Sequence, residues 1–216
     1  MKKLFIAVTV FVCCLGSPLA GSARAATITF AHSGSSGAGS LNGLPFTDKA
    51  FTITAIGDTN SVQPFGGPED LFINHTSAAI SIADVGTFNF ITATRTFING
   101  TLDLVGFSRG FSSAGIGGSD LYDGPFNPVF DGWHMNVSIG PVFGALDGHL
   151  LQWTLSDVVT TGGVLIFDDS FTDVVFTALV AEATPAPAAL PLFATGLGAL
   201  GLLGWRRKRK VTATGV

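Results

Sequence analysis

Short runs of alternating apolar and polar side chains fill residues 26–182. In the run AFTITAI (residues 50–56), Phe51 and Ile53 fall on one face of an extended chain, and Thr52 and Thr54 fall on the other. No part of this segment keeps a helical period for three turns. The segment is therefore predicted to be all-β, with similar runs at residues 27–30, 79–83, 87–91, 101–107, 134–139, 149–155 and 172–180 and a central, continuously apolar strand at 163–168.

Turn-forming pairs such as Gly57-Asp58, Asn99-Gly100 and Gly162-Gly163 separate these runs. Roughly eight to ten short strands with this spacing favour a β-sandwich of jelly-roll type. Two longer connections, residues 32–45 and 106–128, are rich in Gly and Ser, and we expect both to be loops.

The first 25 residues have the three parts of a secretory signal peptide. Lys2 and Lys3 precede an apolar core at residues 4–15, and Ala23 and Ala25 give the small-x-small pattern of a cleavage site. The secretion translocon is thus an expected partner, with cleavage after Ala25. Both cysteines of the chain lie in this leader, so the mature protein would have no disulfide, thiolate nucleophile or Cys-zinc site.

The C-terminal part of the chain contains a second predicted targeting signal. Residues 188–205 are uncharged, and at about 1.5 Å per residue they span roughly 27 Å, close to the ~30 Å core of a bilayer. We therefore expect a transmembrane helix with Trp205 at the lipid headgroups. A basic stop follows, which would stay cytoplasmic and leave the preceding residues outside: Arg206, Arg207, Lys208, Arg209 and Lys210.

The tripeptide Pro185, Ala186 and Pro187, followed by the apolar helix and the basic cluster, resembles the PEP-CTERM sorting signal of Gram-negative bacteria. Ala186 stands where that family has Glu, and the tail is closer to the variant class that reads V-P-L-P-A. The resemblance implies that an exosortase-type membrane peptidase cuts near the tripeptide. It also implies an association with bacteria that produce exopolysaccharide and form biofilms. A standing, uncleaved anchor is the alternative.

Charge is divided unevenly along the chain. All 15 acidic residues lie between Asp48 and Glu182, together with only three basic residues, Lys49, Arg95 and Arg109, which gives this segment a formal charge of −12. Such a surface repels nucleic acids and anionic headgroups, so we exclude nucleic-acid binding.

Calcium is the one cofactor that the sequence suggests. Carboxylates gather in two places, Asp120 with Asp123 and Asp168 with Asp169 and Asp173, and Ca²⁺ prefers six to eight oxygen ligands. Neither group has the spacing of an EF-hand loop. The alternative is that these are solvated turn residues.

Four aromatic residues share the 106–128 segment with Arg109 and the first acidic pair. Aromatic rings beside carboxylates on a loop can grip sugars by stacking and hydrogen bonding. The alternative is that they cover one end of the sandwich. The four are Phe107, Phe111, Tyr122 and Phe126.

The sequence does not favour an enzyme. Its histidines are scattered, without metal-ligand spacing, and we expect each at the surface or at a strand end: His32, His75, His134 and His149. The run GFSSA (residues 110–114) lacks the last glycine of a nucleophile elbow. Trp133 and Trp153 are expected in the core.

Three segments follow from these patterns: a signal peptide (1–25), an all-β exported domain (26–182) and a sorting signal (183–216). The leading hypothesis is a cell-surface or extracellular-matrix protein with a structural or exopolysaccharide-associated role. The alternatives are a calcium-dependent carbohydrate-binding or adhesin module and a weak hydrolase.

Overall fold

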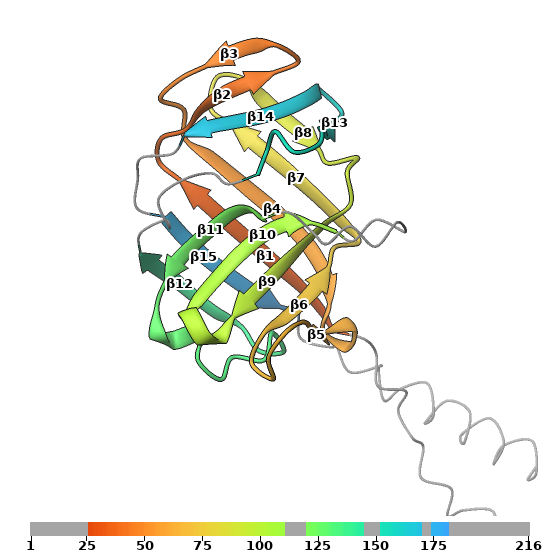
Figure 1. The fold of residues 1–216 in the computed structure, drawn as a ribbon, viewed down its shortest axis with the longest axis vertical. Coiled ribbons are helices and arrows are strands. Elements are labelled where there is room, and N and C mark those ends of the chain that lie inside the picture. Colours follow the sequence, from red (N-terminus) through yellow and green to blue (C-terminus); the bar gives the residue numbers. More distant parts are fainter. Residues whose placement is uncertain (1–25, 111–119, 145–151, 170–173, 182–216) are drawn as a thin grey trace, which may run out of the picture. The chain divides into compact units, whose positions relative to one another are not determined.

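The computed structural model describes residues 26–110, 120–144, 152–169 and 174–181. These residues form β-strands in three antiparallel sheets, with three short 3-10 helices, so the expected all-β class is confirmed (Figure 1). The strands belong to one compact unit that ends at Val180. In the part of the chain that is described, no helix has the length and apolar character needed to cross a membrane.

The largest sheet has six strands, and β1 lies near its centre between β15 and β4. Ile28 of β1 is in register with both Val180 and Gly57, so the start of β1 and the ends of β15 and β4 meet at one end of the sheet. The order across the sheet is β12 (Ile139–Gly144), β15 (Val174–Val180), β1 (Thr27–Gly34), β4 (Phe51–Asp58), β7 (Ser77–Ile82) and β8 (Gly86–Asn89).

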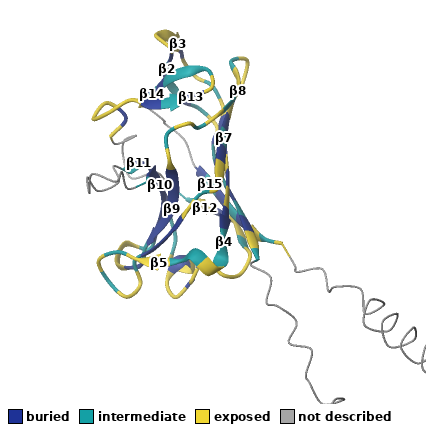
Figure 2. Ribbon diagram, turned by 90° about the vertical axis from the view of Figure 1, so that its right-hand side faces the viewer, coloured by how far each residue is buried: buried dark blue, intermediate teal, exposed yellow. Residues whose placement is uncertain are grey.

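A five-stranded sheet faces the first across the core (Figure 2). Aromatic rings meet between the two sheets: Phe51 lies 5.8 Å from Tyr122, and His32 lies 5.9 Å from Phe107, between ring centroids. The order of this sheet is β11 (Asp120–Phe126), β10 (Leu104–Arg109), β9 (Thr94–Asn99), β6 (Leu71–Asn74) and β5 (Gln63–Pro64).

A third sheet has four strands, in the order β13 (Val158–Thr160), β14 (Gly163–Asp169), β2 (Ala38–Leu41) and β3 (Leu44–Phe46). Asn42 and Gly43 both have positive φ, 50° and 80°, as a tight two-residue hairpin between β2 and β3 requires. The short helices are η1 (Thr59–Ser61), η2 (Gly100–Leu102) and η3 (Pro128–Phe130).

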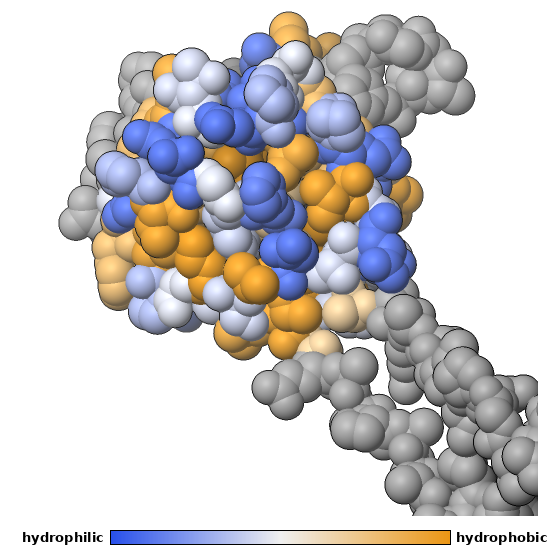
Figure 3. Space-filling view, turned by 90° about the horizontal axis from the view of Figure 1, so that it is seen from below, coloured by the Kyte–Doolittle hydropathy of each residue, from blue (hydrophilic) through white to orange (hydrophobic). Residues whose placement is uncertain are grey.

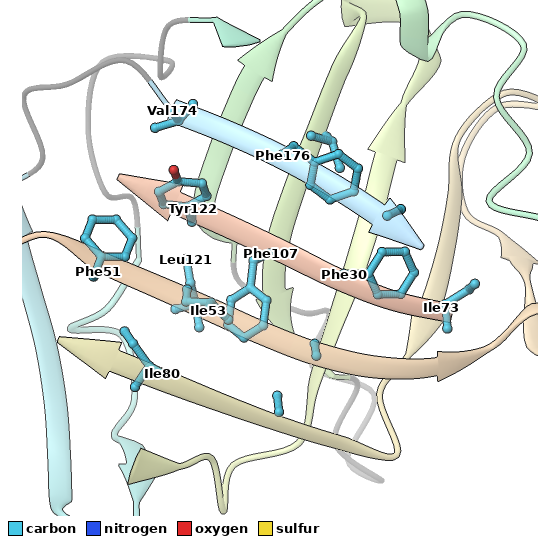
Figure 4. Packing of buried hydrophobic residues seen from close by; sticks show 14 of the residues in the cluster. Phe30, Phe51, Ile53, Ile73, Ile80, Phe107, Leu121, Tyr122, Val174 and Phe176 are labelled. Atoms are coloured by element: carbon cyan, nitrogen blue, oxygen red, sulfur yellow. The ribbon is translucent and has the colours of Figure 1, made fainter. Parts of the chain in front are cut away.

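The core is built from the inward residues of alternating strands, and Figure 4 shows Phe30, Ile53, Phe107 and Phe176 converging there. Trp133 and Trp153 are buried, as predicted. Trp153 also donates its indole N–H to the carbonyl of Leu121 at 2.8 Å.

Two predicted strands are wrong where the structure describes them. Residues 134–138 form no strand, because Met135 adopts a left-handed φ of 55° and turns into the core, and the strand begins at Ile139. Residues 152–155 form turns and bends, and residues 149–151 lie outside the described part.

Both predicted long loops are also wrong in their described parts. Residues 32–45 complete β1 and form β2 and most of β3, while 106–110 and 120–126 belong largely to β10 and β11. The glycines that suggested a loop serve close packing instead. A Cβ at Gly39 would lie 2.0 Å from the carbonyl oxygen of Ile166 on the paired strand β14.

Candidate functional site

The residues of the two predicted export signals lie outside the described part of the chain, as do three residues of the internal predictions. They are Ala23, Ala25, Pro185, Ala186, Pro187, Trp205, Arg206, Arg207, Lys208, Arg209 and Lys210, with Phe111, His149 and Asp173. The site that can be built from atoms is therefore the polar part of the β-sheet body.

The first acidic pair lies on a strand and not on a loop. Asp120 and Asp123 belong to β11, where Asp120 is in register with Ser108 and Asp123 with Gly106 of β10. Ser108 is in register in turn with Arg95 of β9. Arg95, Ser108 and Asp120 thus form one row across three strands, on the face that does not contain the inward-pointing Phe107.

Arg95 lies at the β9 end of this row and is only 4% exposed. Its Nε donates to Ser108 Oγ at 2.8 Å, and its guanidinium carbon lies 4.8 Å from the Phe72 ring centroid and 5.6 Å from that of Phe65. Both distances fit cation–π attraction. Arg95 therefore packs its guanidinium against two aromatic rings and hydrogen-bonds to the neighbouring strand.

Burial and charge pairing act on this row in opposite directions. Burial lowers the pKa of Arg95, and the nearby Asp120 carboxylate raises it again. Burial raises the pKa of Asp120, and Arg95 partly reverses that shift. Each charge therefore favours the ionised form of the other side chain, against the larger effect of burial.

The two acidic groups that suggested calcium lie in different sheets. Asp120 is half-buried and Asp123 is buried on β11, whereas Asp168 is exposed on β14. Within the described ranges, no group of three or more His, Cys, Asp or Glu side chains is placed to hold a metal ion. The backbone of Asp169 pairs with Ala38, and Asp173 lies outside the described ranges, so the calcium hypothesis stays a prediction.

The three aromatic residues of the 106–128 segment that the structure describes do not form an exposed sugar platform. Phe107 and Tyr122 are fully buried between the two facing sheets, and Phe126 is half-buried at the end of β11. The sugar-gripping prediction is wrong for the two buried rings, because their strands turn them into the core. Their role is packing.

Arg109, the last residue of β10, ties this sheet to a distant segment. Its guanidinium donates to the carbonyl oxygen of Ser156 at 2.9 Å and also contacts Ser156 Oγ and the carbonyl oxygen of Gln152. It is buried, and burial lowers its pKa. The side chain therefore holds residues 152–156 against the sheet.

Two histidines form the second polar cluster, between the sheets. His32 on β1 places Nε2 3.2 Å from Thr96 Oγ1, and His75 places Nε2 3.0 Å from the same hydroxyl. The other ring nitrogen of His75 lies 2.9 Å from Thr94 Oγ1. The expected surface or strand-end position is wrong for His32, which is fully buried in mid-strand, whereas His134 is exposed as expected.

Burial lowers the pKa of His32 to about 3 and that of His75 also to about 3, with a smaller contribution from His32 to the second. Both rings are therefore neutral at pH 7. His32 Nδ1 has no hydrogen-bond partner among the described residues. Because His32 is 0% exposed, a substrate cannot reach it, and the cluster joins the two sheets as a polar contact.

The sequence contained a signal for this cluster that the predictions missed. Ile28, Phe30 and His32 follow one another at period two in β1, which places His32 on the core face. Thr94 and Thr96 show the same alternation around Arg95 in β9. No comparable signal pairs Arg95 with Ser108, because strand register depends on the whole sheet.

No protein-family model, curated protein or solved structure matches the chain.

Proposed function

We propose that this protein is an exported cell-surface or extracellular-matrix component with a structural or exopolysaccharide-associated role. An exosortase-type peptidase would recognise the tail at residues 185–187 and cut it there. Until that cleavage, the 188–205 helix would hold the exported domain, which we call the body, outside the inner membrane. The proposal does not include catalysis. It does include the finer assignment of the fold to a jelly-roll-type sandwich, which the two facing antiparallel sheets support.

The observation that carries the proposal is the position of the two ends of the body. The first strand, β1, and the last, β15, are antiparallel neighbours, and Ile28 is in register with Val180. The first and last strands of the described domain therefore have their free ends at the same end of the same sheet. In such a domain, the leader can be removed and the tail can serve as an anchor without the loss of any strand.

The predicted processing positions also fall just beyond the bonded part of the body. The carbonyl of Ala26 accepts hydrogen bonds from the amide and hydroxyl of Thr59, and the amide of Val180 donates to Ser138 Oγ. Cleavage after Ala25 or near Pro185 would leave these hydrogen bonds in place. A fold without Cys in its exported part also needs no oxidation step after export.

The proposal is tested by following the cellular location of a variant without the tail's positive charges, expressed in a host that has an exosortase. Replacing the five cations of residues 206–210 with Ser is expected to misorient or mislocalise the protein, measured by cell fractionation and protease accessibility. Lys49→Ser is the matched control, since Lys49 is a half-exposed cation paired with Asp84 and lies outside the tail. Normal surface delivery of the five-residue variant would overturn the proposed topology.

A further inference from the structure

The outer face of the six-stranded sheet is almost free of charge, although the segment around it carries a formal charge of −12. Its strands contain only two ionisable side chains, His32, which points into the core, and Asp58, the last residue of β4. Asp58 is used locally, because it accepts a hydrogen bond from the amide of Asn60 at the start of η1. The other outward positions are mostly Thr, Ser, Ala and larger apolar residues, with Asn89 on β8.

The register places these outward residues in three rows across the strands. The first contains Leu179, Thr29, Ile56 and Ser77, and the second contains Thr177, Ala31, Thr54, Ala79 and Asn89. The third contains Phe143, Val175, Ser33, Thr52, Ser81 and Thr87. We call these three rows the neutral face.

Exposed apolar side chains lie at both ends of the neutral face. Leu179 and Ile56 flank Thr29 in the first row and are 59% and 37% exposed, and Phe143 begins the third row at 63%. Covering these three side chains would remove apolar area from water, which favours association.

The hydroxyls between them are partly satisfied by one another. Ser33 Oγ lies 3.0 Å from Thr52 Oγ1, and Thr87 Oγ1 donates to Ser81 Oγ at 3.1 Å. Each such pair reduces the number of bonds to water that must be broken when the face is covered. The third row can therefore be buried at a lower desolvation cost than its composition suggests.

We propose that the neutral face pairs with the neutral face of a second copy of this chain. Two bodies that each carry net negative charge repel one another wherever acidic surfaces meet, and the neutral face is the broad surface on which that repulsion is least. The end of the body where β1 begins is less suitable, because it shows apolar and hydrophilic side chains interspersed and carries Asp58 (Figure 3).

The geometry of the sheet fits a two-fold pair. Antiparallel sheets stack face to face at about 10 Å, and a two-fold axis along the strands would bring Ala31 and Thr54 of both copies to the centre. Because β1 begins and β15 ends at one end of the sheet, this axis also leaves the chain ends of both copies on one side. Two copies held by their tails can then pair side by side.

The size of the face sets the strength of the pair. Six strands about 4.8 Å apart and eight residues long at most, at ~3.3 Å per residue, give on the order of 600 Å² per copy. That is below the roughly 800 Å² per partner of a standard stable interface. The pair is therefore weak and depends on protein concentration. It does not depend on where the protein resides, so its failure would leave the proposed function standing.

Cysteine cross-linking tests the pairing, because the full chain contains only Cys13 and Cys14. In a Cys13→Ser, Cys14→Ser background, Thr54→Cys places one thiol at the centre of the neutral face. Leu102→Cys is the matched control, since Leu102 is exposed on η2 outside that face. The full-length variants would be purified in mild non-ionic detergent and treated with a short bismaleimide.

We expect a cross-linked dimer from Thr54→Cys and about tenfold less from Leu102→Cys. Adding Thr29→Glu to the Thr54→Cys chain places like charges in the interface, which costs several kcal/mol, and should reduce the dimer by at least about tenfold. Leu102→Glu should leave it unchanged. Unaltered tryptophan fluorescence and labelling by a monofunctional maleimide would show that each variant is folded and its thiol reactive.

Equal cross-linking at the two positions would overturn the proposal, because it would indicate association through the tail or by chance encounter. A reactive Thr54→Cys thiol that gives no dimer would overturn it as well. Protection of that thiol only after a neutral polysaccharide is added, without a dimer, would overturn self-pairing and assign the neutral face to a polymer.

Discussion

Acidification should destabilise this protein through the buried His32 and the half-buried His75. The ordinary pKa of 6.5 is lowered to about 3 in the folded state for both His32 and His75, chiefly because burial disfavours the charged ring. As the pH falls below 6.5, the unfolded chain binds protons at these positions and the folded chain does not. The stability is therefore complete above about pH 6.5 and is lost progressively down to about pH 3.

The loss of stability at pH 5 follows from the difference between this pH and the ordinary histidine pKa of 6.5. One unit corresponds to about 1.4 kcal/mol, so the 1.5 units between 6.5 and 5 give about 2 kcal/mol for each ring. The two rings together give about 4 kcal/mol. A small domain has roughly 5–15 kcal/mol of stability in total, so this loss is large enough to measure.

The assay is urea unfolding at pH 8 and pH 5, followed by the fluorescence of the buried Trp133 and Trp153. His32→Phe keeps an aromatic ring and removes one titrating group, so the pH-dependent loss should fall by about 2 kcal/mol, to about half. His134→Gln is the matched control, because His134 is exposed, and it should keep the full loss.

Comparing wild type with His32→Phe cancels the contributions of the other titrating groups to the pH dependence. Burial raises the pKa of Asp120, so the folded state binds that proton more readily and partly offsets the loss at low pH. The same offset is present in wild type and in His32→Phe. An equal pH dependence in these two proteins would refute the assignment of His32 as a buried neutral ring.

Three further predictions concern the sheets and the proposed cofactor. Arg95→Ala should lower the free energy of unfolding by about 3 kcal/mol in urea, because it removes the buried hydrogen bond to Ser108 Oγ, the contacts with two aromatic rings and a cation that favours the ionised form of Asp120. A loss below about 1 kcal/mol would contradict this account of Arg95. Gly39→Ala should cost more than about 3 kcal/mol, since its Cβ would meet the Ile166 carbonyl at 2.0 Å, whereas Gly43→Ala meets no neighbouring atom and should cost about 1–2 kcal/mol through its positive φ alone. Equal losses at the two glycines would show that β2 does not pack closely on β14. Millimolar Ca²⁺ should leave the melting midpoint unchanged, whereas a rise of several degrees would support the calcium hypothesis.

Most strands could be predicted because their burial follows the residue period. Phe51 and Ile53 alternate with Thr52 and Thr54, and β4 buries the first pair as expected. The strand prediction fails where the alternation of apolar and polar residues is present but the backbone conformation is not extended. Met135 belongs to an apparent alternation but bends the chain by a left-handed φ, which the letters do not reveal.

Glycine-rich sequence was the other source of error. Gly34 and Gly37 lie against the ring of Phe51, and Gly39 lies against a paired backbone, so these residues allow close packing between strands. Composition alone cannot distinguish this from a loop, because both uses require a residue without a side chain. The third sheet, which depends on β2 and β3, was missed for this reason.

The polar clusters could be predicted only in part. The position of His32 on the core face follows from its period in β1, but its partners come from a different sheet, 64 residues away at Thr96. Arg95 and Asp120 are likewise brought together by the register of three strands. Contacts of this kind depend on topology and not on local sequence.

The intact mass of the protein taken from its native host, with its cellular location, tests the central claim most directly. We predict a chain outside the cytoplasm that begins at Ala26 and ends near residues 185–188. A chain dissolved in the cytosol with both termini intact would contradict the account.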